Sequence, residues 1–287
     1  MDRPSKDRIP RRWPGALGVL LALVVLLSQL SARPLAQAAA AAPGPDQADV
    51  LGTITDGATG QAIGGASVSL PAFGLSAVSD TAGQIAWRGI ALAEPVVATT
   101  ISITAPGFGE WTIQDVRLVA GDTLILTPEL GAEPILIVVP PPRSERTDPP
   151  ESQLSQALWD AVTADQTNLP LPSTIRVRVT GDPYCNTSLP YTVVTVDFME
   201  YVKHVLPNEW ISGWPWESLR AGAMAAKMYA WSIVAAGGRY PDADVYDSTC
   251  DQVYNPAVSY ASTNAAVEFT FNWRLTWQSS LMLVRTY

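Results

Sequence analysis

The sequence predicts a multidomain protein in which an antiparallel β-sandwich precedes an α+β domain. Between residues 49 and 131, short segments of alternating apolar and polar residues are separated by turn residues, as is typical of a β-sandwich. Beyond residue 152, strand-like segments lie before and after one long apolar helix, which indicates an α+β domain. We expect a proline-rich linker, residues 132–152, to join the two domains.

Residues 1–38 have the pattern of a signal peptide. Basic residues precede an uninterrupted apolar run from Gly15 to Leu27, and Ala36-Gln37-Ala38 offers a small-x-small cleavage site. The run is shorter than the roughly 20 residues that a membrane-spanning helix needs. We therefore predict an exported protein, extracellular or in the cell envelope. The alternative is an uncleaved segment that anchors the chain to the membrane.

The predicted mature chain is strongly acidic. Residues 39–287 contain 12 Lys and Arg against 25 Asp and Glu, a net charge of −13, and have no basic cluster. Binding to nucleic acid depends on cations that neutralise phosphates. The composition therefore argues against a nucleic-acid partner.

After an alanine-rich spacer, residues 39–48, the predicted sandwich occupies residues 49–131. Its strand candidates are residues 50–55, 66–70, 85–87, 98–105 and 123–126. The sequence resembles the carboxypeptidase-regulatory-like family of small β-sandwiches through the ordered segments Gly52 to Asp56, Thr59-Gly60, Gly65 to Val68, Ser79 to Gly83 and Ala105 to Phe108. This resemblance implies a spacing or adhesive module without chemistry of its own.

The second domain, residues 153–287, is built around one helix. Pro215 suits the first turn of a helix, Glu217 favours its positive end, and Gly237-Gly238 is the expected stop. Apolar residues recur at three- and four-residue spacing on one face of it: Leu219, Ala223, Ala226, Ala230 and Ile233. The elements expected before this helix are a short helix over 153–163, strands over 174–179 and 191–196, and an amphipathic run over 198–205.

Glu209 lies in the corner between this amphipathic run and the long helix. It is flanked by three tryptophans, Trp210, Trp214 and Trp216. A carboxyl group against aromatic rings loses solvation, which suits a general acid, and indole rings can stack on the apolar faces of sugars. The alternative is that Glu209 caps a helix while the tryptophans belong to the core.

The chain from about Ile175 onward resembles the stage II sporulation protein D / LytB amidase-enhancer (SpoIID/LytB) family. The resemblance rests on Tyr201-Val202, Asn208-Glu209-Trp210, Trp214, Glu217 to Ala221, Ala225-Ala226, Tyr229-Ala230, Gln252 to Tyr254, Thr263 and Ala265 to Val267. Three residues depart from the family pattern, because Gly222, Lys227 and Met228 replace a glutamine, an arginine and a threonine. The family usually continues beyond the position of Tyr287, so C-terminal truncation is one interpretation.

The resemblance implies an exported cell-wall protein that binds and cleaves peptidoglycan glycan strands as a lytic transglycosylase. Glu209 would be its single general acid/base. Six further residues are candidate substrate contacts: Trp210, Trp214, Arg220, Lys227, Gln252 and Tyr254. For Arg220 and Lys227 the alternative is solvated surface charge. The alternative function is a non-catalytic module that binds the cell wall or activates an amidase.

Cys185 and Cys250 are the only cysteines of the chain. Two cysteines in an exported chain most often form one disulfide. A zinc site is the alternative, but with His204 as the only histidine the ligand set is too sparse. We therefore predict a Cys185–Cys250 disulfide, no metal site and no cofactor.

Overall fold

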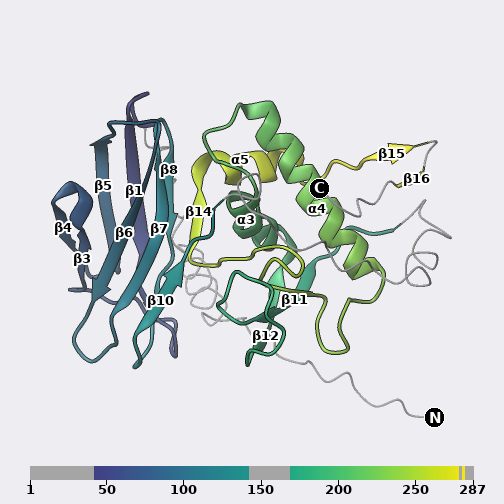
Figure 1. The fold of residues 1–287 in the computed structure, drawn as a ribbon, viewed down its shortest axis with the longest axis horizontal. Helices are drawn as coiled ribbons and strands as arrows, with labels where there is room; N and C mark the ends of the chain where they lie inside the picture. Colours follow the sequence, from purple (N-terminus) through teal and green to yellow (C-terminus); the bar gives the residue numbers. More distant parts are fainter. Residues whose placement is uncertain (1–41, 142–168, 278–279, 282–287) are drawn as a thin grey trace, which may run out of the picture. The chain divides into compact units, whose positions relative to one another are not determined.

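The computed structural model describes residues 42–141, 169–277 and 280–281 (Figure 1). The predicted signal peptide and the predicted helix over 153–163 lie outside these residues. Strands predominate in the described residues, and the α-helices belong to the C-terminal part. Among the residues described, no helix combines the length and apolar character needed to cross a membrane.

The N-terminal part consists of β-strands and one short 3₁₀ helix, η1. Each of the five predicted strands overlaps an observed one. The elements are β1 (Gln47–Thr53), β2 (Thr55–Asp56), β3 (Ser67–Leu70), η1 (Pro71–Phe73), β4 (Leu75–Val78), β5 (Gln84–Ala91), β6 (Val96–Thr104), β7 (Trp111–Val119), β8 (Thr123–Leu126), β9 (Glu129–Leu130) and β10 (Ile135–Val138).

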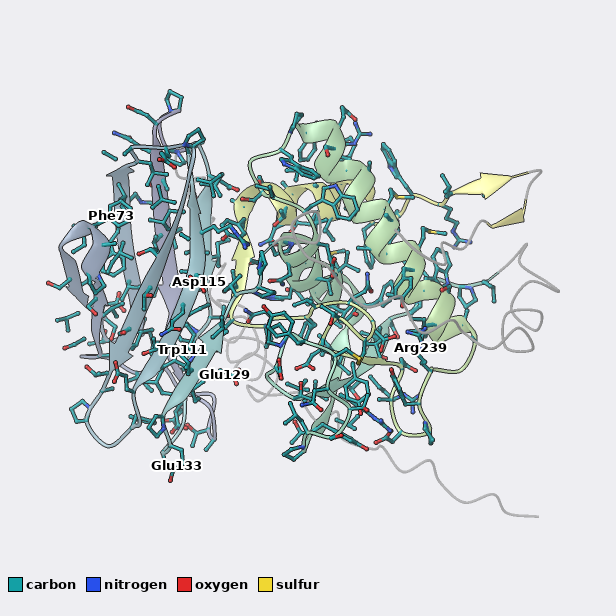
Figure 2. All side chains as sticks on the ribbon, in the orientation of Figure 1. Phe73, Trp111, Asp115, Glu129, Glu133 and Arg239 are labelled. Atoms are coloured by element: carbon teal, nitrogen blue, oxygen red, sulfur yellow. A yellow bond between two sulfur atoms is a disulfide. The ribbon has the colours of Figure 1, made fainter. Side chains whose placement is uncertain are left out.

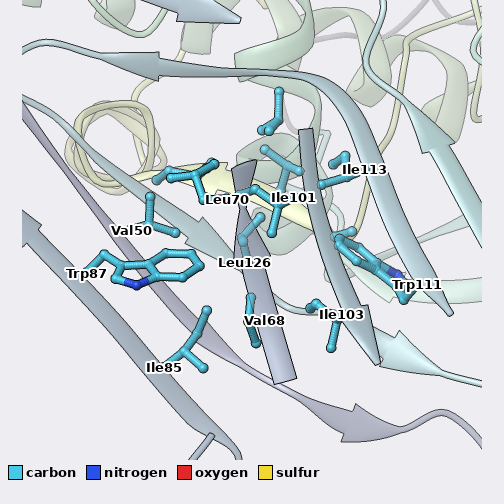
Figure 3. Close-up of a cluster of buried hydrophobic side chains, with 14 of the residues drawn as sticks. Val50, Val68, Leu70, Ile85, Trp87, Ile101, Ile103, Trp111, Ile113 and Leu126 are labelled. Atoms are coloured by element: carbon cyan, nitrogen blue, oxygen red, sulfur yellow. The ribbon is translucent and has the colours of Figure 1, made fainter. Parts of the chain in front are cut away.

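Two sheets bury one hydrophobic core between them. Their strand orders are β14-β8-β1-β5 and β10-β7-β6-β3-β4, and β2 pairs separately with β9. Alternation along the strands brings Val50 and Trp87 of the first sheet into the same cluster as Val68, Ile103 and Trp111 of the second (Figure 3). Burial of each such side chain stabilises the fold by about 1.5–3 kcal/mol.

The predicted antiparallel arrangement is wrong for three strand pairs. β1 pairs with β8 in parallel, β10 with β7, and β2 with β9. The strands of each pair are not consecutive in the chain, so no hairpin turn requires them to run in opposite directions.

The sequence analysis did not predict β7, because a β-bulge interrupts the alternation of apolar and polar residues along this strand. Thr99 pairs with Val116 and Ile101 with Ile113, so two residues of β7 oppose one residue of β6. Asp115 (labelled in Figure 2) lies at this bulge with φ = 58°. The extra residue moves the buried positions from Trp111 and Ile113 to Val116 and Leu118, and this shift hides the period-two pattern.

The segment predicted as a linker begins with a strand, β10, that pairs with β7. Only five apolar residues, 135–139, lie between Pro134 and the prolines at 140–142, and the first four of them form β10. β10 is an edge strand, where prolines at its ends remove no hydrogen bond from the interior of the sheet.

The C-terminal part packs three helices and a small sheet of order β12-β11-β13 around a second core. Ala223, Ala226 and Ala230 on the predicted apolar face of α4 are all buried, as predicted. The elements are β11 (Thr174–Val179), β12 (Thr192–Asp197), α3 (Phe198–Glu209), α4 (Trp216–Ala235), β13 (Val245–Tyr246), β14 (Val258–Tyr260), α5 (Ala261–Thr270), β15 (Thr276–Trp277) and β16 (Ser280–Leu281).

β14 comes from the C-terminal part of the chain but completes an N-terminal sheet. It pairs antiparallel with β8, with Val258 opposite Leu126 and Tyr260 opposite Leu124. The sheets of residues 47–138 therefore share backbone hydrogen bonds with the segment that follows the helices α3 and α4.

Candidate functional site

Glu209 is the last residue of α3. The helix begins after Asp197, whose side chain accepts hydrogen bonds from the backbone N–H groups of Met199 and Glu200. The sequence placed Glu209 in a corner beyond an amphipathic run that ended at Val205. The helix instead continues through Pro207, which lies in its last turn and removes only one backbone donor there.

The Glu209 carboxylate is held against the loop that precedes β14. Its Oε1 accepts a hydrogen bond from the backbone N–H of Val253 at 3.2 Å. Only 4% of Glu209 is exposed to solvent. A backbone donor and a buried setting fix the carboxyl group in one position, which a general acid/base requires.

Gln252 connects the two long helices beside this carboxylate. Its Nε2 donates to the carbonyl oxygen of Ala226 in α4 at 3.2 Å, and its Oε1 accepts from the hydroxyl of Tyr201 in α3 at 3.2 Å. The ring of Tyr201 stacks on the ring of Tyr254 with centroids 5.4 Å apart. The structure therefore brings Glu209, Gln252 and Tyr254 together. Tyr201, which the sequence analysis did not assign to the site, contacts both Gln252 and Tyr254.

Two titratable rings, Tyr254 of this cluster and His204 beside it, are neutral near pH 7. Burial, followed by the nearby charges of Glu129 and Glu200, raises the pKa of Tyr254 to about 12. Burial lowers the pKa of His204, whose Nδ1 lies 3.0 Å from the carbonyl oxygen of Val258. His204 thus belongs to the packing around Tyr254, with ring centroids 6.1 Å apart and the rings edge to face.

Trp210 and Trp214 form an edge-to-face pair directly after Glu209, with ring centroids 6.4 Å apart. Both remain partly exposed. The Trp210 ring lies against Gly222 of α4, where an added Cβ would be 2.6 Å from the ring carbon Cδ2. Gly222, one of the departures from the family pattern, therefore leaves the space that the indole fills.

We expect Gly222→Ala to lower stability although alanine favours helices. In the wild-type background the new methyl group collides with Trp210, and overpacking typically costs about 1–3 kcal/mol. In a Trp210→Ala background the new methyl group has no indole ring to collide with. The same change should then stabilise the helix by about 1 kcal/mol, because alanine favours helices more than glycine does. Urea unfolding of the four proteins of this double-mutant cycle measures both effects. Equal effects in the two backgrounds would contradict the contact.

The two cations predicted to bind substrate have separate partners. Lys227 is 1% exposed, and its Nζ donates to the carbonyl oxygens of Thr270, Phe271 and Trp273 at 2.7–2.9 Å, at and just beyond the C-terminal end of α5. Burial, followed by the charge of Arg274, lowers the pKa of Lys227 to about 8. Lys227 thus closes the C-terminal end of a helix, where a cation is favourable.

Arg220 lies two turns before Lys227, on the same side of α4. Its guanidinium pairs with Glu217 at 2.7 Å and packs over the rings of Phe269 and Trp273 at 4.6 and 4.5 Å. A groove of about 450 Å³ follows this surface of α4 and includes Arg220, Met224 and Trp273 among its walls. Arg220 is therefore the predicted cation that faces a groove.

The predicted disulfide is present between Cys185 and Cys250. Cys250 is buried and precedes Asp251 and Gln252 in the loop that holds Glu209. The bond closes a separation of 65 residues, so that it joins this loop to the segment after β11. Among the residues described, no group of three metal-binding side chains could hold a metal ion.

We expect a Cys185→Ser, Cys250→Ser variant to lose about 2–4 kcal/mol of unfolding free energy, because the disulfide restricts the unfolded chain. Denaturant unfolding under non-reducing conditions measures the difference. Thiol labelling of the denatured wild type should find neither cysteine free. Two labelled thiols would contradict the bridge.

Comparison with known proteins identifies the region that carries this site. Residues 190–277 match the family model described as SpoIID, stage II sporulation protein. This part of the chain is a SpoIID domain. The resemblance predicted from the sequence is therefore confirmed for the segment from β12 to β15, which includes Glu209, Gln252 and Tyr254.

A curated protein matches a short part of the chain. An uncharacterized protein of Brachyspira hyodysenteriae is 37% identical over 73 residues, which are 25% of this chain and 19% of that protein. The chain thus covers about a fifth of the length of this relative.

Several solved structures match part of the chain. A chain of a type II cohesin–X-dockerin complex from Acetivibrio cellulolyticus is 26% identical and has a TM-score of 0.23. The match covers 31% of this chain and 56% of the chain in the complex. The 5-hydroxyisourate hydrolase of Klebsiella pneumoniae is 24% identical and has a TM-score of 0.18. The match covers 31% of this chain and 89% of the hydrolase chain. TM-scores this low establish no common fold.

Sequence reasoning missed two partners of the site in the SpoIID domain, Tyr201 and the backbone N–H of Val253. Tyr201 was visible as an aromatic residue two helical turns before Glu209, on the apolar face of the amphipathic run. No side-chain pattern could have indicated the Val253 N–H, because a backbone donor is placed by the fold of the loop alone.

Proposed function

We propose that the protein is an exported cell-wall protein whose SpoIID domain binds and cleaves peptidoglycan glycan strands, with Glu209 as the general acid/base. The SpoIID family is associated with cell-wall-related function. The observation that carries the proposal is the position of Glu209, a buried carboxylate fixed by the Val253 N–H beside Gln252 and Tyr254 within the family match.

The proposed reaction needs one carboxyl group that acts twice. Protonated Glu209 donates its proton to the glycosidic oxygen, and the bond from C1 of the sugar to this oxygen breaks. The resulting carboxylate takes the proton of the same sugar's C6 hydroxyl, and O6 bonds to C1. A 1,6-anhydro ring closes, no water is consumed, and Glu209 is protonated again. Hydrolysing glycosidases generally use two carboxylates instead.

The neighbours of Glu209 supply the surroundings for this chemistry. Burial removes water that would compete for the proton and strengthens electrostatic interactions at the carboxyl group. Trp210 and Trp214 retain exposed ring surface next to Glu209, on which sugar rings can stack. Arg220 is the candidate contact for a sugar carboxylate, because it faces the groove along α4.

A non-catalytic role is the second candidate, and one observation favours it. Polar positions of the family's helix are occupied here by residues that pack: Gly222 receives the Trp210 ring, and Lys227 is buried on backbone carbonyls. A SpoIID domain with these changes could bind glycan or activate a cell-wall amidase without cleaving anything itself.

Incubation of the protein with peptide-free glycan strands tests the two functions together. The proposal predicts that long strands are converted to short fragments by the protein alone. Co-sedimentation with intact strands without fragmentation, together with faster stem-peptide release when a cell-wall amidase is added, would favour the non-catalytic role.

A further inference from the structure

We infer that the N-terminal sheets position the Glu209 site, and that Asp122, in the turn between β7 and β8, is the residue through which they do so. This rests on the proposed function for the role of Glu209. The contacts that carry it join residues far apart in the chain, and they reach the segments that follow Glu209 and Val253.

Asp122 supplies a cap that α5 lacks. The residue before α5, Tyr260, offers no side-chain cap, and the first turn of the helix contains no acidic residue. Asp122 Oδ1 accepts the backbone N–H of Ser262 at 3.2 Å, and Oδ2 accepts the Ser262 hydroxyl at 2.6 Å. A carboxylate with 7% exposure at the positive end of a helix is a favourable cap, here from 140 residues earlier in the chain.

The same contact reaches the loop that follows Glu209. The Ser262 hydroxyl lies 3.1 Å from the carbonyl oxygen of Ser212, three residues beyond Glu209. The next residue, Gly213, lies so close to β7 that an added Cβ would be 2.8 Å from Cγ1 of Val119. The segment leaving Glu209 is therefore held between Ser262 and the end of β7.

The segment leaving Val253 is held by β8. Val253, whose N–H donates to Glu209, comes five residues before β14. Between them, the carbonyl oxygen of Pro256 accepts the hydroxyl of Thr127 at 2.6 Å, and that of Ala257 accepts the Thr127 N–H at 3.0 Å. β14 then pairs with β8, and the Tyr260 hydroxyl donates to the carbonyl oxygen of Arg117 in β7 at 2.7 Å.

Both partners of the Glu209–Val253 hydrogen bond are thus tied to β7, β8 and the turn between them. A spacing or adhesive module, as the carboxypeptidase-regulatory-like resemblance implied, would need no such contacts. The N-terminal sheets instead act as part of the support of the site, and Asp122 acts through Ser262 rather than on substrate.

Hydrogen exchange in the full-length protein tests this role without requiring activity. In Asp122→Ala we expect the amides of Val253 and Tyr254 to exchange about tenfold faster than in the wild type, because loss of a cap loosens the segments that it holds. Asp122→Asn keeps an acceptor oxygen for the Ser262 N–H and should retain most of the protection. Ser262→Ala, a milder change, should give an intermediate rate if Asp122→Ala does not fold.

Asp80→Ala is the matched control. Asp80 accepts the N–H groups of Ala82 and Gln84 in the turn before β5, at the opposite edge of the sheet from β14. The Asp80→Ala variant should leave hydrogen exchange at the amides of Val253 and Tyr254 unchanged. Equal exchange at these amides in Asp122→Ala and Asp80→Ala would overturn the inference. Faster exchange in Asp122→Ala with no glycan cleavage by the wild type would keep it and reject the proposed function.

Discussion

Replacing Glu209 with glutamine should reduce cleavage of peptide-free glycan strands by about 10²–10⁴-fold, the usual contribution of general acid–base catalysis. Glutamine has nearly the same shape, and its carbonyl oxygen can still accept the Val253 N–H that now reaches Glu209 Oε1. The variant therefore keeps the fold and glycan binding but cannot donate a proton. Initial rates of strand shortening, with thermal unfolding as a check on the fold, measure the effect.

Glu217→Gln is the control for this variant. Glu217 also lies close in sequence to the tryptophans, but its side chain is 76% exposed and pairs with Arg220 at the surface of α4. A pair of this kind contributes about 0–1 kcal/mol to stability. We expect the Glu217→Gln variant to cleave glycan strands at the wild-type rate. Cleavage that persists in Glu209→Gln would remove the catalytic role of Glu209.

The second large effect is expected for Arg239→Met, which should destabilise the protein by about 3–5 kcal/mol. Arg239 (labelled in Figure 2) follows α4 and pairs with Asp251, whose side chain is completely buried. The Asp251 carboxylate also accepts the Tyr246 N–H at 2.8 Å and the Tyr240 hydroxyl at 3.0 Å. Methionine fills the space of the arginine stem but leaves a buried carboxylate without its cation.

Urea unfolding measures this difference, and Lys203→Met provides the comparison. Lys203 pairs with Glu200 and Glu268, whose side chains are 50% and 58% exposed, so both carboxylates remain solvated after the change. We expect Lys203→Met to cost no more than about 1 kcal/mol. A similar small cost for Arg239→Met would show that the buried pair contributes no more than a surface pair.

Local signals in the sequence predicted the elements that depend on local conformation. α4 starts after Pro215 and stops before Gly237 and Gly238, which adopt φ values of 89° and 96° that other residues rarely adopt. The strand over 174–179 was predicted at its observed bounds, because its alternation is uninterrupted. Gln252 and Tyr254 were assigned as candidate substrate contacts by family resemblance and not by any spacing in the chain.

The remaining features depend on partners that are distant in sequence. β14 has only three residues, and it is a strand because β8, more than 130 residues earlier, offers it a free edge. Lys227 was expected to contact substrate. Nothing near it in the sequence indicates the three carbonyl oxygens, at and just beyond the end of α5, that surround its ammonium group. In both cases the deciding group is brought in by tertiary structure, which overrides local preference.

Mass spectrometry of the products from peptide-free glycan strands tests the proposed function most directly. The one-carboxylate reaction at Glu209 predicts fragments that end in 1,6-anhydro-muramic acid, in the wild type and not in Glu209→Gln. Fragments with ordinary reducing ends would mean that water is the acceptor and that a second catalytic group takes part. Intact strands after prolonged incubation with the folded wild-type protein would contradict catalysis by this SpoIID domain altogether.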